Sequence, residues 1–279
     1  MVIKHNEPLM AHTTFRMGGT AARMYIPETM EELKAILRQE PEARLIGGGS
    51  NLLINDKKIF QAVIDLGKFN DLIEDLGQGR YKVGASLRLQ KLIQRINEDG
   101  YGGIEYLYSV PGLVGGAICM NAGRGRQFQQ SISDYLQRVH ILEKGESRWI
   151  EKEECGFTYR NSIFKNSDCV ILEAVFCFTE QSYEESYRLR KERMELVRKV
   201  QDPSKPNFGT VFMEADPGIM KGIRFLGIKK GGVSFSKKTS NWLLNNGGTY
   251  QDTVFLLKLV KKLHAAAGKK CCQEVICWD

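Results

Sequence analysis

Two glycine clusters limit what this chain can fold into more than any other feature of its sequence. The first is Gly47-Gly-Gly-Ser-Asn-Leu-Leu53, and the second is Pro111-Gly-Leu-Val-Gly-Gly-Ala117, which continues to Met120-Asn-Ala-Gly123. Backbone without a Cβ can approach a diphosphate closely and point its N–H groups at it. Neither cluster has the spacing G-x-G-x-x-G or G-x-x-x-x-G-K-[ST], which disfavours a Rossmann fold and a P-loop. Tight turns and a nucleotide site both stay open, and the polar residues within the clusters favour the nucleotide: Ser50, Asn51 and Asn121.

Helix and strand signals alternate along the rest of the chain. The capping box Thr29-Met-Glu-Glu32 predicts a helix over about 30–39, and Ser86 is expected to cap a second helix that ends near Gly100. Later periodic segments predict helices over 182–200, 217–226 and 252–267. Short apolar runs bounded by Gly and Asp predict strands over 44–46, 62–66, 81–83, 136–142 and 169–178. This alternation predicts an α+β architecture.

The helix expected over 182–200 is rich in charge, so we expect it to be an exposed connector. Its sparse apolar face consists of Leu189, Leu196, Val197 and Val200. The two prolines of Gln201-Asp-Pro-Ser-Lys-Pro206 then mark a boundary before a small last lobe.

The net charge of +7 is concentrated at one end of the 279-residue chain. From Gln201 onward there are twelve basic and six acidic residues, which places +6 in the last third. Such a field suits a phosphate-bearing ligand, although solvated surface lysines would give the same count. Nucleic acid ranks last, because the lysine doublets are not interleaved with aromatic residues in an RNA-binding pattern.

Cysteine and histidine usage indicates an intracellular protein without a metal site. The seven cysteines form no C-x-x-C motif, and their odd number predicts free thiols in a reducing compartment. The four histidines have no metal-binding spacing, so we expect no metal. No apolar run reaches the roughly 18 residues of a membrane helix, and the N-terminus shows no signal-peptide pattern. We therefore expect a cytoplasmic protein without a membrane partner.

A series of motifs runs almost from end to end in the order found in one family. They are His12-Thr-Thr-Phe-Arg-Met-Gly-Gly19, Gly47–Leu53, Ser109-Val-Pro-Gly-Leu-Val-Gly-Gly-Ala117 with Met120–Gly123, Cys155-Gly-Phe-Thr-Tyr-Arg-Asn-Ser-Ile-Phe-Lys165, Gly209-Thr-Val-Phe212, Asn241-Trp-Leu-Leu-Asn-Asn-Gly-Gly248 and Glu274-Val275. With these motifs the chain resembles the UDP-N-acetylenolpyruvoylglucosamine reductase (MurB) family of peptidoglycan precursor synthesis. The short interval from Arg160 to Gly209 resembles the subgroup that lacks an extra tyrosine-bearing loop.

The resemblance implies an α+β fold in three parts. Residues 1–68 and 69–180 would form the two lobes of an FAD-binding fold of the vanillyl-alcohol-oxidase (PCMH) type, and 181–279 a connector helix with a small α+β substrate-binding domain. It implies an FAD-dependent oxidoreductase that reduces UDP-N-acetylglucosamine enolpyruvate to UDP-N-acetylmuramate with NADPH. We expect the FAD to be non-covalent, because no distinctive attachment motif surrounds His12 or Cys119. The expected partner is the UDP-sugar substrate, with no nucleic acid, and the expected state is a monomer.

The resemblance also assigns site residues. Thr210 would be the proton donor, and Arg160 and Glu274 would act near the enol carboxylate. The residues implied for FAD binding are Arg16, Gly47, Gly48, Gly49, Ser50, Asn51, Leu52, Ser109, Val110, Pro111, Gly112, Gly115, Gly116, Ala117, Asn121, Ala122 and Gly123. Those expected at the substrate are Tyr159, Asn241 and Asn245.

The segment around Thr210 departs from the family pattern. The family usually has Gly-Ser-Val-Phe-Lys-Asn-Pro there, whereas this chain has Gly209-Thr-Val-Phe-Met-Glu-Ala215. Thr210 keeps a hydroxyl group, but Met213 and Glu214 remove a cation and add a negative charge, and Thr239 replaces a histidine. Two alternatives therefore stay open: a divergent member that reduces another UDP-sugar or enolpyruvyl compound, and a flavin-binding protein without this activity. The sequence also leaves the choice between NADPH and NADH open.

Overall fold

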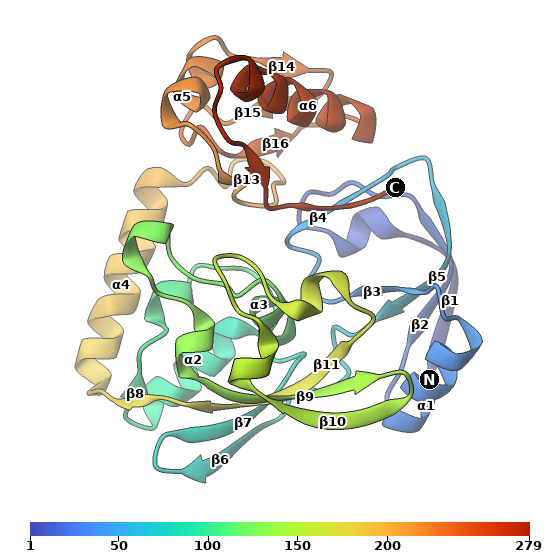
Figure 1. Cartoon of the computed structure of the whole chain (residues 1–279), viewed down its shortest axis with the longest axis vertical. Coiled ribbons are helices and arrows are strands. Elements are labelled where there is room, and N and C mark those ends of the chain that lie inside the picture. The colour runs from blue at the N-terminus through green and yellow to red at the C-terminus, as the bar shows by residue number, and fades with distance from the viewer. The chain divides into compact units, whose positions relative to one another are not determined.

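The chain forms two compact units, each assembled from separate stretches of sequence. Figure 1 shows the computed structural model, which describes residues 1–279 apart from the side chain of Asn166. Unit 1 comprises Met1–Ile3, Tyr25–Gly48 and Ala62–Val197. Unit 2 comprises Lys4–Met24, Gly49–Gln61 and Arg198–Asp279. The first glycine cluster is therefore divided between the units after Gly48.

A five-stranded antiparallel sheet with the order β10-β9-β11-β7-β6 dominates unit 1 (Figure 1). Its strands are β6 (Ile73–Gly77), β7 (Arg80–Gly84), β9 (Leu136–Glu143), β10 (Glu146–Glu151) and β11 (Val170–Cys177). Helices α2 (Leu89–Glu98) and α3 (Val114–Cys119) pack against this sheet in one buried apolar cluster. The apolar residues Leu89, Leu92, Ile93 and Ile96 recur at helical spacing, so they lie on one face of α2. All four of these side chains are buried.

A second cluster of unit 1 packs α1 (Met30–Gln39) against strand residues. Leu33 and Ile36 of α1 contact Ile64 and side chains of β9 and β11 in this cluster. A four-stranded sheet has the order β1-β2-β5-β3, with β1 (Val2–Pro8), β2 (Thr20–Ile26), β3 (Arg44–Ile46) and β5 (Ile59–Asp65). The other elements that lie wholly or mostly in unit 1 are β8 (Tyr101–Gly102), which pairs with β12 (Thr179–Glu180), the long helix α4 (Tyr183–Val200) and 3-10 turns at Glu105–Leu107, Arg126–Phe128, Ile132–Tyr135, Lys152–Cys155 and Ile163–Asn166. A further 3-10 turn, Leu9–His12, belongs to unit 2.

Unit 2 packs two helices and short strands around Phe212, Leu256 and Val260. Helix α5 (Pro217–Phe225) begins after Asp216, whose carboxylate accepts from the backbone N–H groups of Gly218 and Ile219. Helix α6 (Tyr250–Ala266) begins with a complete capping box of Thr249 and Asp252. The strands are β4 (Leu52–Ile54), β13 (Phe212–Glu214), β14 (Lys229–Lys230), β15 (Val233–Phe235), β16 (Leu243–Asn245), β17 (Cys272–Gln273) and β18 (Ile276–Trp278).

Two local predictions are wrong for identifiable reasons. Thr29 does cap α1, but Glu32 accepts from the backbone N–H of Glu28, so the predicted capping box is only half formed. Ser86 does not cap α2, because its hydroxyl donates to the carbonyl of Leu66, and Arg88 stands at the N-cap without a side-chain bond.

The apolar face predicted for α4 is also partly wrong. Leu196 and Val200 are exposed, while the buried residue of the helix is Ser186. The expectation of an exposed, charged helix is confirmed, because most other side chains of α4 are exposed or half-buried.

Candidate functional site

The two glycine clusters touch each other within unit 1. A Cβ on Gly48 would lie 3.2 Å from the Cα of Gly112, so the absence of side chains lets the two loops approach. Gly115 allows a second close approach, since its Cβ would lie 2.9 Å from that of Ala85. A Cβ on Gly116, in contrast, would have no atom within 4 Å. The second cluster is therefore tightly held on one side and open at Gly116.

Within unit 2, the first cluster continues against the segment around His12. Gly49 has φ +58°, and a Cβ there would lie 1.9 Å from the carbonyl oxygen of His12. The backbone N–H of Thr14 donates to the carbonyl of Gly49 over 3.1 Å. Only glycine can occupy this position, because both its conformation and its surroundings exclude a side chain.

Asn121 holds the end of the second cluster and offers a free acceptor. Its side chain is 5% exposed, and its Nδ2 donates to the carbonyl of Thr158 over 2.9 Å. Its Oδ1 is buried and has no hydrogen-bond partner among the described residues. A buried polar oxygen without a donor is costly, so this atom suits a ligand with an N–H or O–H group. Together with the glycine backbone, it fits a dinucleotide such as FAD.

Arg160 is held against the same segment of unit 1. Its Nη2 donates to the carbonyl of Gly123 over 2.7 Å, and its Nη1 lies 3.5 Å from the carbonyl of Asn121. The centre of the neighbouring Tyr159 ring lies 4.7 Å from the guanidinium carbon of Arg126 and 5.4 Å from that of Arg160. The structure therefore brings Asn121, Gly123, Tyr159 and Arg160 together, as the predicted site requires.

Unit 2 brings Thr210 and Glu274 onto adjacent backbone segments. Strand β13 pairs with β17, and the backbone N–H of Glu274 donates to the carbonyl of Val211 over 2.8 Å. Thr210 itself is exposed, and it forms an isolated bridge with Trp242. The hydroxyl of Thr210 is thus at the surface of unit 2, one residue from the backbone bond to Glu274.

Asn51 connects the first glycine cluster to Glu274 in the same unit. Its Nδ2 donates to the carbonyl of Glu274 over 3.3 Å, and its own carbonyl accepts from the backbone N–H of Ile276 over 3.0 Å. These bonds continue into the parallel pairing of β18 with β4. A predicted cofactor residue and a predicted catalytic residue are therefore neighbours within unit 2.

The amides of Asn241 and Asn245 are occupied by protein backbone. Asn241 accepts from the N–H of Phe212 over 3.1 Å and donates to its carbonyl over 2.8 Å. Asn245 donates to the carbonyl of Phe15 over 2.9 Å and accepts from the N–H of Gly248. Both asparagines thus fix backbone in unit 2, and their contact with substrate stays a prediction.

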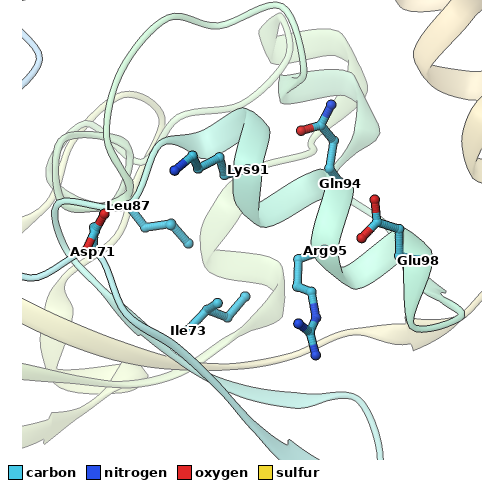
Figure 2. A pocket seen from close by; sticks show the side chains of 7 residues that line it. All are labelled: Asp71, Ile73, Leu87, Lys91, Gln94, Arg95 and Glu98. Atoms are coloured by element: carbon cyan, nitrogen blue, oxygen red, sulfur yellow. The ribbon is translucent and has the colours of Figure 1, made fainter.

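The pocket in Figure 2 lies elsewhere in unit 1 and involves none of the predicted site residues. It has a volume of about 330 Å³ and lies beside α2, and its lining includes Lys91, Gln94 and Arg95 of this helix together with Asp71 and Ile73. Arg95 already forms an ion pair with Asp99 at 2.7 Å. We assign no function to this pocket.

The described residues offer no metal site, no disulfide and no membrane-spanning helix. Among the described residues, no group of three or more His, Cys, Asp and Glu side chains could hold a metal ion. All seven cysteines are free thiols. No helix in the described part of the chain combines the length and apolar character needed to cross a membrane.

Comparison with known proteins first defines the class. Residues 21–151 match the family model described as an FAD binding domain, so this chain is an FAD-binding protein. The UDP-N-acetylenolpyruvoylglucosamine reductase of Carboxydothermus hydrogenoformans is 35% identical over 272 residues, which cover 94% of this chain and 88% of the relative. The enzyme of the same name from Bacillus subtilis is 32% identical over 268 residues, which cover 92% and 87%. This chain belongs to the UDP-N-acetylenolpyruvoylglucosamine reductase family.

A solved structure agrees with this assignment. The crystal structure of UDP-N-acetylenolpyruvylglucosamine reductase (MurB) from Thermus caldophilus superposes with a TM-score of 0.82 at 28% identity, covering 100% of both chains. The family, the α+β FAD-binding fold, and the class of FAD- and NADPH-dependent reductase predicted from the sequence are therefore confirmed. The roles of individual residues stay predictions.

Proposed function

We propose that this chain reduces UDP-N-acetylglucosamine enolpyruvate to UDP-N-acetylmuramate with NADPH, as a step of peptidoglycan precursor synthesis. Relatives that match over most of their length are named for this reductase activity. The structural observation that carries the proposal is the backbone bond between Val211 and Glu274, which holds Thr210 and Glu274 on neighbouring segments. FAD, when bound, supplies hydride transfer from NADPH to the enolpyruvyl group.

The residues of unit 1 would hold the cofactor and counter the developing charge. Gly47, Gly48 and Gly112 permit close approach of a diphosphate, and the free Oδ1 of Asn121 accepts a hydrogen bond from the cofactor. Reduction at the β-carbon of the enolpyruvyl group places negative charge on the α-carbon and its carboxylate. The guanidinium of Arg160, fixed by its bond to the carbonyl of Gly123, offsets that charge.

The residues of unit 2 would complete the reduction with a proton. Thr210 donates its hydroxyl proton to the α-carbon, which neutralises the carbanionic intermediate. Glu274 acts near the enol carboxylate, and Asn51 helps to place Glu274 by donating to its backbone carbonyl. Because the side chain of threonine is branched at Cβ, only one rotamer of Thr210 points the hydroxyl at the substrate.

We infer that the different parts of the chain bind different ligands. Residues 1–68 and 69–180 bind FAD, and 181–279 bind the UDP-sugar, whose diphosphate and carboxylate suit the positive last third. We also infer a monomer that acts in the cytoplasm, since seven free thiols are typical of a reducing compartment.

Anaerobic rapid mixing of the purified protein tests this function. NADPH should bleach the flavin absorbance, and UDP-N-acetylglucosamine enolpyruvate should restore it. Thr210→Ala should leave the bleaching unchanged and slow the restoration by about 100-fold, the scale of general acid catalysis, whereas Thr210→Ser should stay active. If Thr210→Ala restores the absorbance at the wild-type rate, another group supplies the proton.

A second candidate function is reduction of a different enolpyruvyl compound. Met213 and Glu214 of β13 favour it, because they remove a cation and add a carboxylate close to Thr210. A protein that NADPH bleaches but the UDP-sugar does not reoxidise would favour this candidate or loss of the activity. The double substitution Met213→Lys with Glu214→Asn should then restore reoxidation by the UDP-sugar if these two residues set the specificity.

A further inference from the structure

Two arginines of α4 contact Tyr108 and Ser109, immediately before the second glycine cluster, and a third arginine of unit 1, Arg124, lies close enough to interact electrostatically with one of them, Arg193. Arg193 of α4 donates its Nε to the hydroxyl oxygen of Ser109 over 2.8 Å. Arg190 lies three residues earlier on the same face of the helix, with its guanidinium 5.4 Å from the centre of the Tyr108 ring. Arg124 follows the second cluster and stacks on Phe128 at 3.6 Å.

None of the three arginines has a carboxylate partner among the described residues. Arg188 of the same helix shows the contrast, because it forms ion pairs with Glu185 and Glu192 at 2.6 Å each. The sequence carries the same signal: no acidic residue stands three or four positions from Arg190 or Arg193. These guanidinium groups therefore form a cationic cluster without an internal counter-ion.

Burial makes this arrangement costly for the free protein. All three side chains are half-buried, and the Nε of Arg190 is buried without a hydrogen-bond partner among the described residues. Burial and the neighbouring charge of Arg124 lower the pKa of Arg193 below its ordinary value. An anion bound between these side chains would offset the repulsion between the guanidinium groups and would accept a hydrogen bond from the unpaired Nε of Arg190.

We propose that Arg124, Arg190 and Arg193 form a binding site for a phosphate group of a nucleotide. The planar guanidinium donates two parallel hydrogen bonds to phosphate oxygens, which suits this ligand better than a point charge would. Since Ser109 accepts from Arg193, its own O–H can donate to the same anion. The cluster thus adds side-chain contacts to the loop from Val110 to Gly112.

This inference rests on the proposed function, which brings three nucleotides to the protein. The diphosphate of FAD, the 2′-phosphate of NADPH and the diphosphate of the UDP-sugar share the chemistry that the cluster recognises. Binding can be measured without turnover, so failure of the proposed reaction would leave the test of the cluster interpretable. Conversely, if variants of these arginines turn over normally and bind nucleotides as the wild type does, only the proposed phosphate site is wrong and the proposed reaction stands.

The test compares Arg124→Gln, Arg190→Gln and Arg193→Gln with the control Arg188→Gln, which removes the same charge from an exposed ion pair of α4. Calorimetry on the flavin-loaded protein would measure affinity for 2′,5′-ADP and for UDP, and flavin content after dialysis would report on FAD. At least one probe should lose tenfold or more in affinity in the three variants, with less than twofold change in the control. Which probe responds identifies the source of the phosphate.

Arg193→Lys separates loss of the site from misfolding. This variant keeps the positive charge and a long side chain but lacks the planar guanidinium with its parallel N–H donors. An intermediate loss for the same probe, with unchanged thermal unfolding, supports the site. If all three glutamine variants keep wild-type affinity for 2′,5′-ADP and UDP and retain their flavin, the arginines bind no nucleotide phosphate and the proposal is wrong.

Discussion

Replacing Asn241 with alanine tests whether this side chain positions the segment that carries Thr210. The substitution removes two hydrogen bonds to Phe212, one from its N–H at 3.1 Å and one to its carbonyl at 2.8 Å. Each such bond contributes about 0.5–1.5 kcal/mol, so the free energy of unfolding should fall by about 1–3 kcal/mol. The backbone bond from the N–H of Val211 to the carbonyl of Asn241 survives the change, so we expect the fold to persist.

The two half-reactions then separate positioning from general stability. Flavin reduction by NADPH should stay near the wild-type rate, while reoxidation by the enolpyruvyl substrate should slow by about tenfold, which corresponds to about 1.4 kcal/mol of the barrier. Asn241→Asp keeps the acceptor for the N–H of Phe212 and should lose about half as much stability. The neighbouring exposed Asn246 offers a matched control, since its side chain forms no hydrogen bond among the described residues.

Urea unfolding and anaerobic rapid mixing decide the outcome. A loss of unfolding free energy below about 0.5 kcal/mol in Asn241→Ala, the range of an ordinary surface substitution, would refute the assignment of these bonds. Equal slowing of both half-reactions would refute the positioning role, because Asn241 would then act on the whole protein rather than on the segment of Thr210.

Gly49→Ala should destabilise the protein by about 2–4 kcal/mol, because φ is +58° and the new Cβ would lie 1.9 Å from the carbonyl oxygen of His12; an unchanged melting temperature would contradict this. Gly116→Ala meets no atom within 4 Å and should melt normally but retain less flavin, as the absorbance ratio of flavin to protein would show. Acid precipitation should release all FAD into the supernatant, since burial raises the pKa of the candidate Cys119 thiol to about 11 and keeps it protonated; flavin in the pellet would speak against this. The KM for the UDP-sugar should rise with ionic strength if the +6 charge of the last third attracts the diphosphate, and a flat KM would show that those lysines are only solvated surface.

Local signals in the sequence predicted the helices better than they predicted the contacts. Thr29 begins α1 as expected, because N-capping needs only the next turn of the chain. Ser86 has an equally good local signal, but its hydroxyl bonds to Leu66, a residue that only the tertiary fold brings near. The apolar Leu196 is exposed for the same reason, since no local rule says which face of a helix finds a neighbour.

The candidate site shows the same limit. Motif order in the sequence indicated Asn51 and Glu274 separately, but their contact depends on the parallel pairing of β4 with β18, which no short-range pattern specifies. Arg190 and Arg193 were missed because a charged helix is usually a solvated surface. The distinguishing signal was the absence of acidic residues one turn away from them, in contrast to Arg188.

The pairing of β18 with β4 also sets the order of events when the protein is made. Asn51 and Glu274 are 223 positions apart, so the segment that carries the first glycine cluster leaves the ribosome long before its partner strand exists. Until Ile276–Trp278 emerges, the edge of β4 has no neighbour, and Glu274 cannot take its place beside Val211. Unit 2 therefore completes its fold only after Ile276–Trp278 has been synthesised, and loss of this strand would leave β4 unpaired and release the segment that carries Glu274 from its place beside Val211.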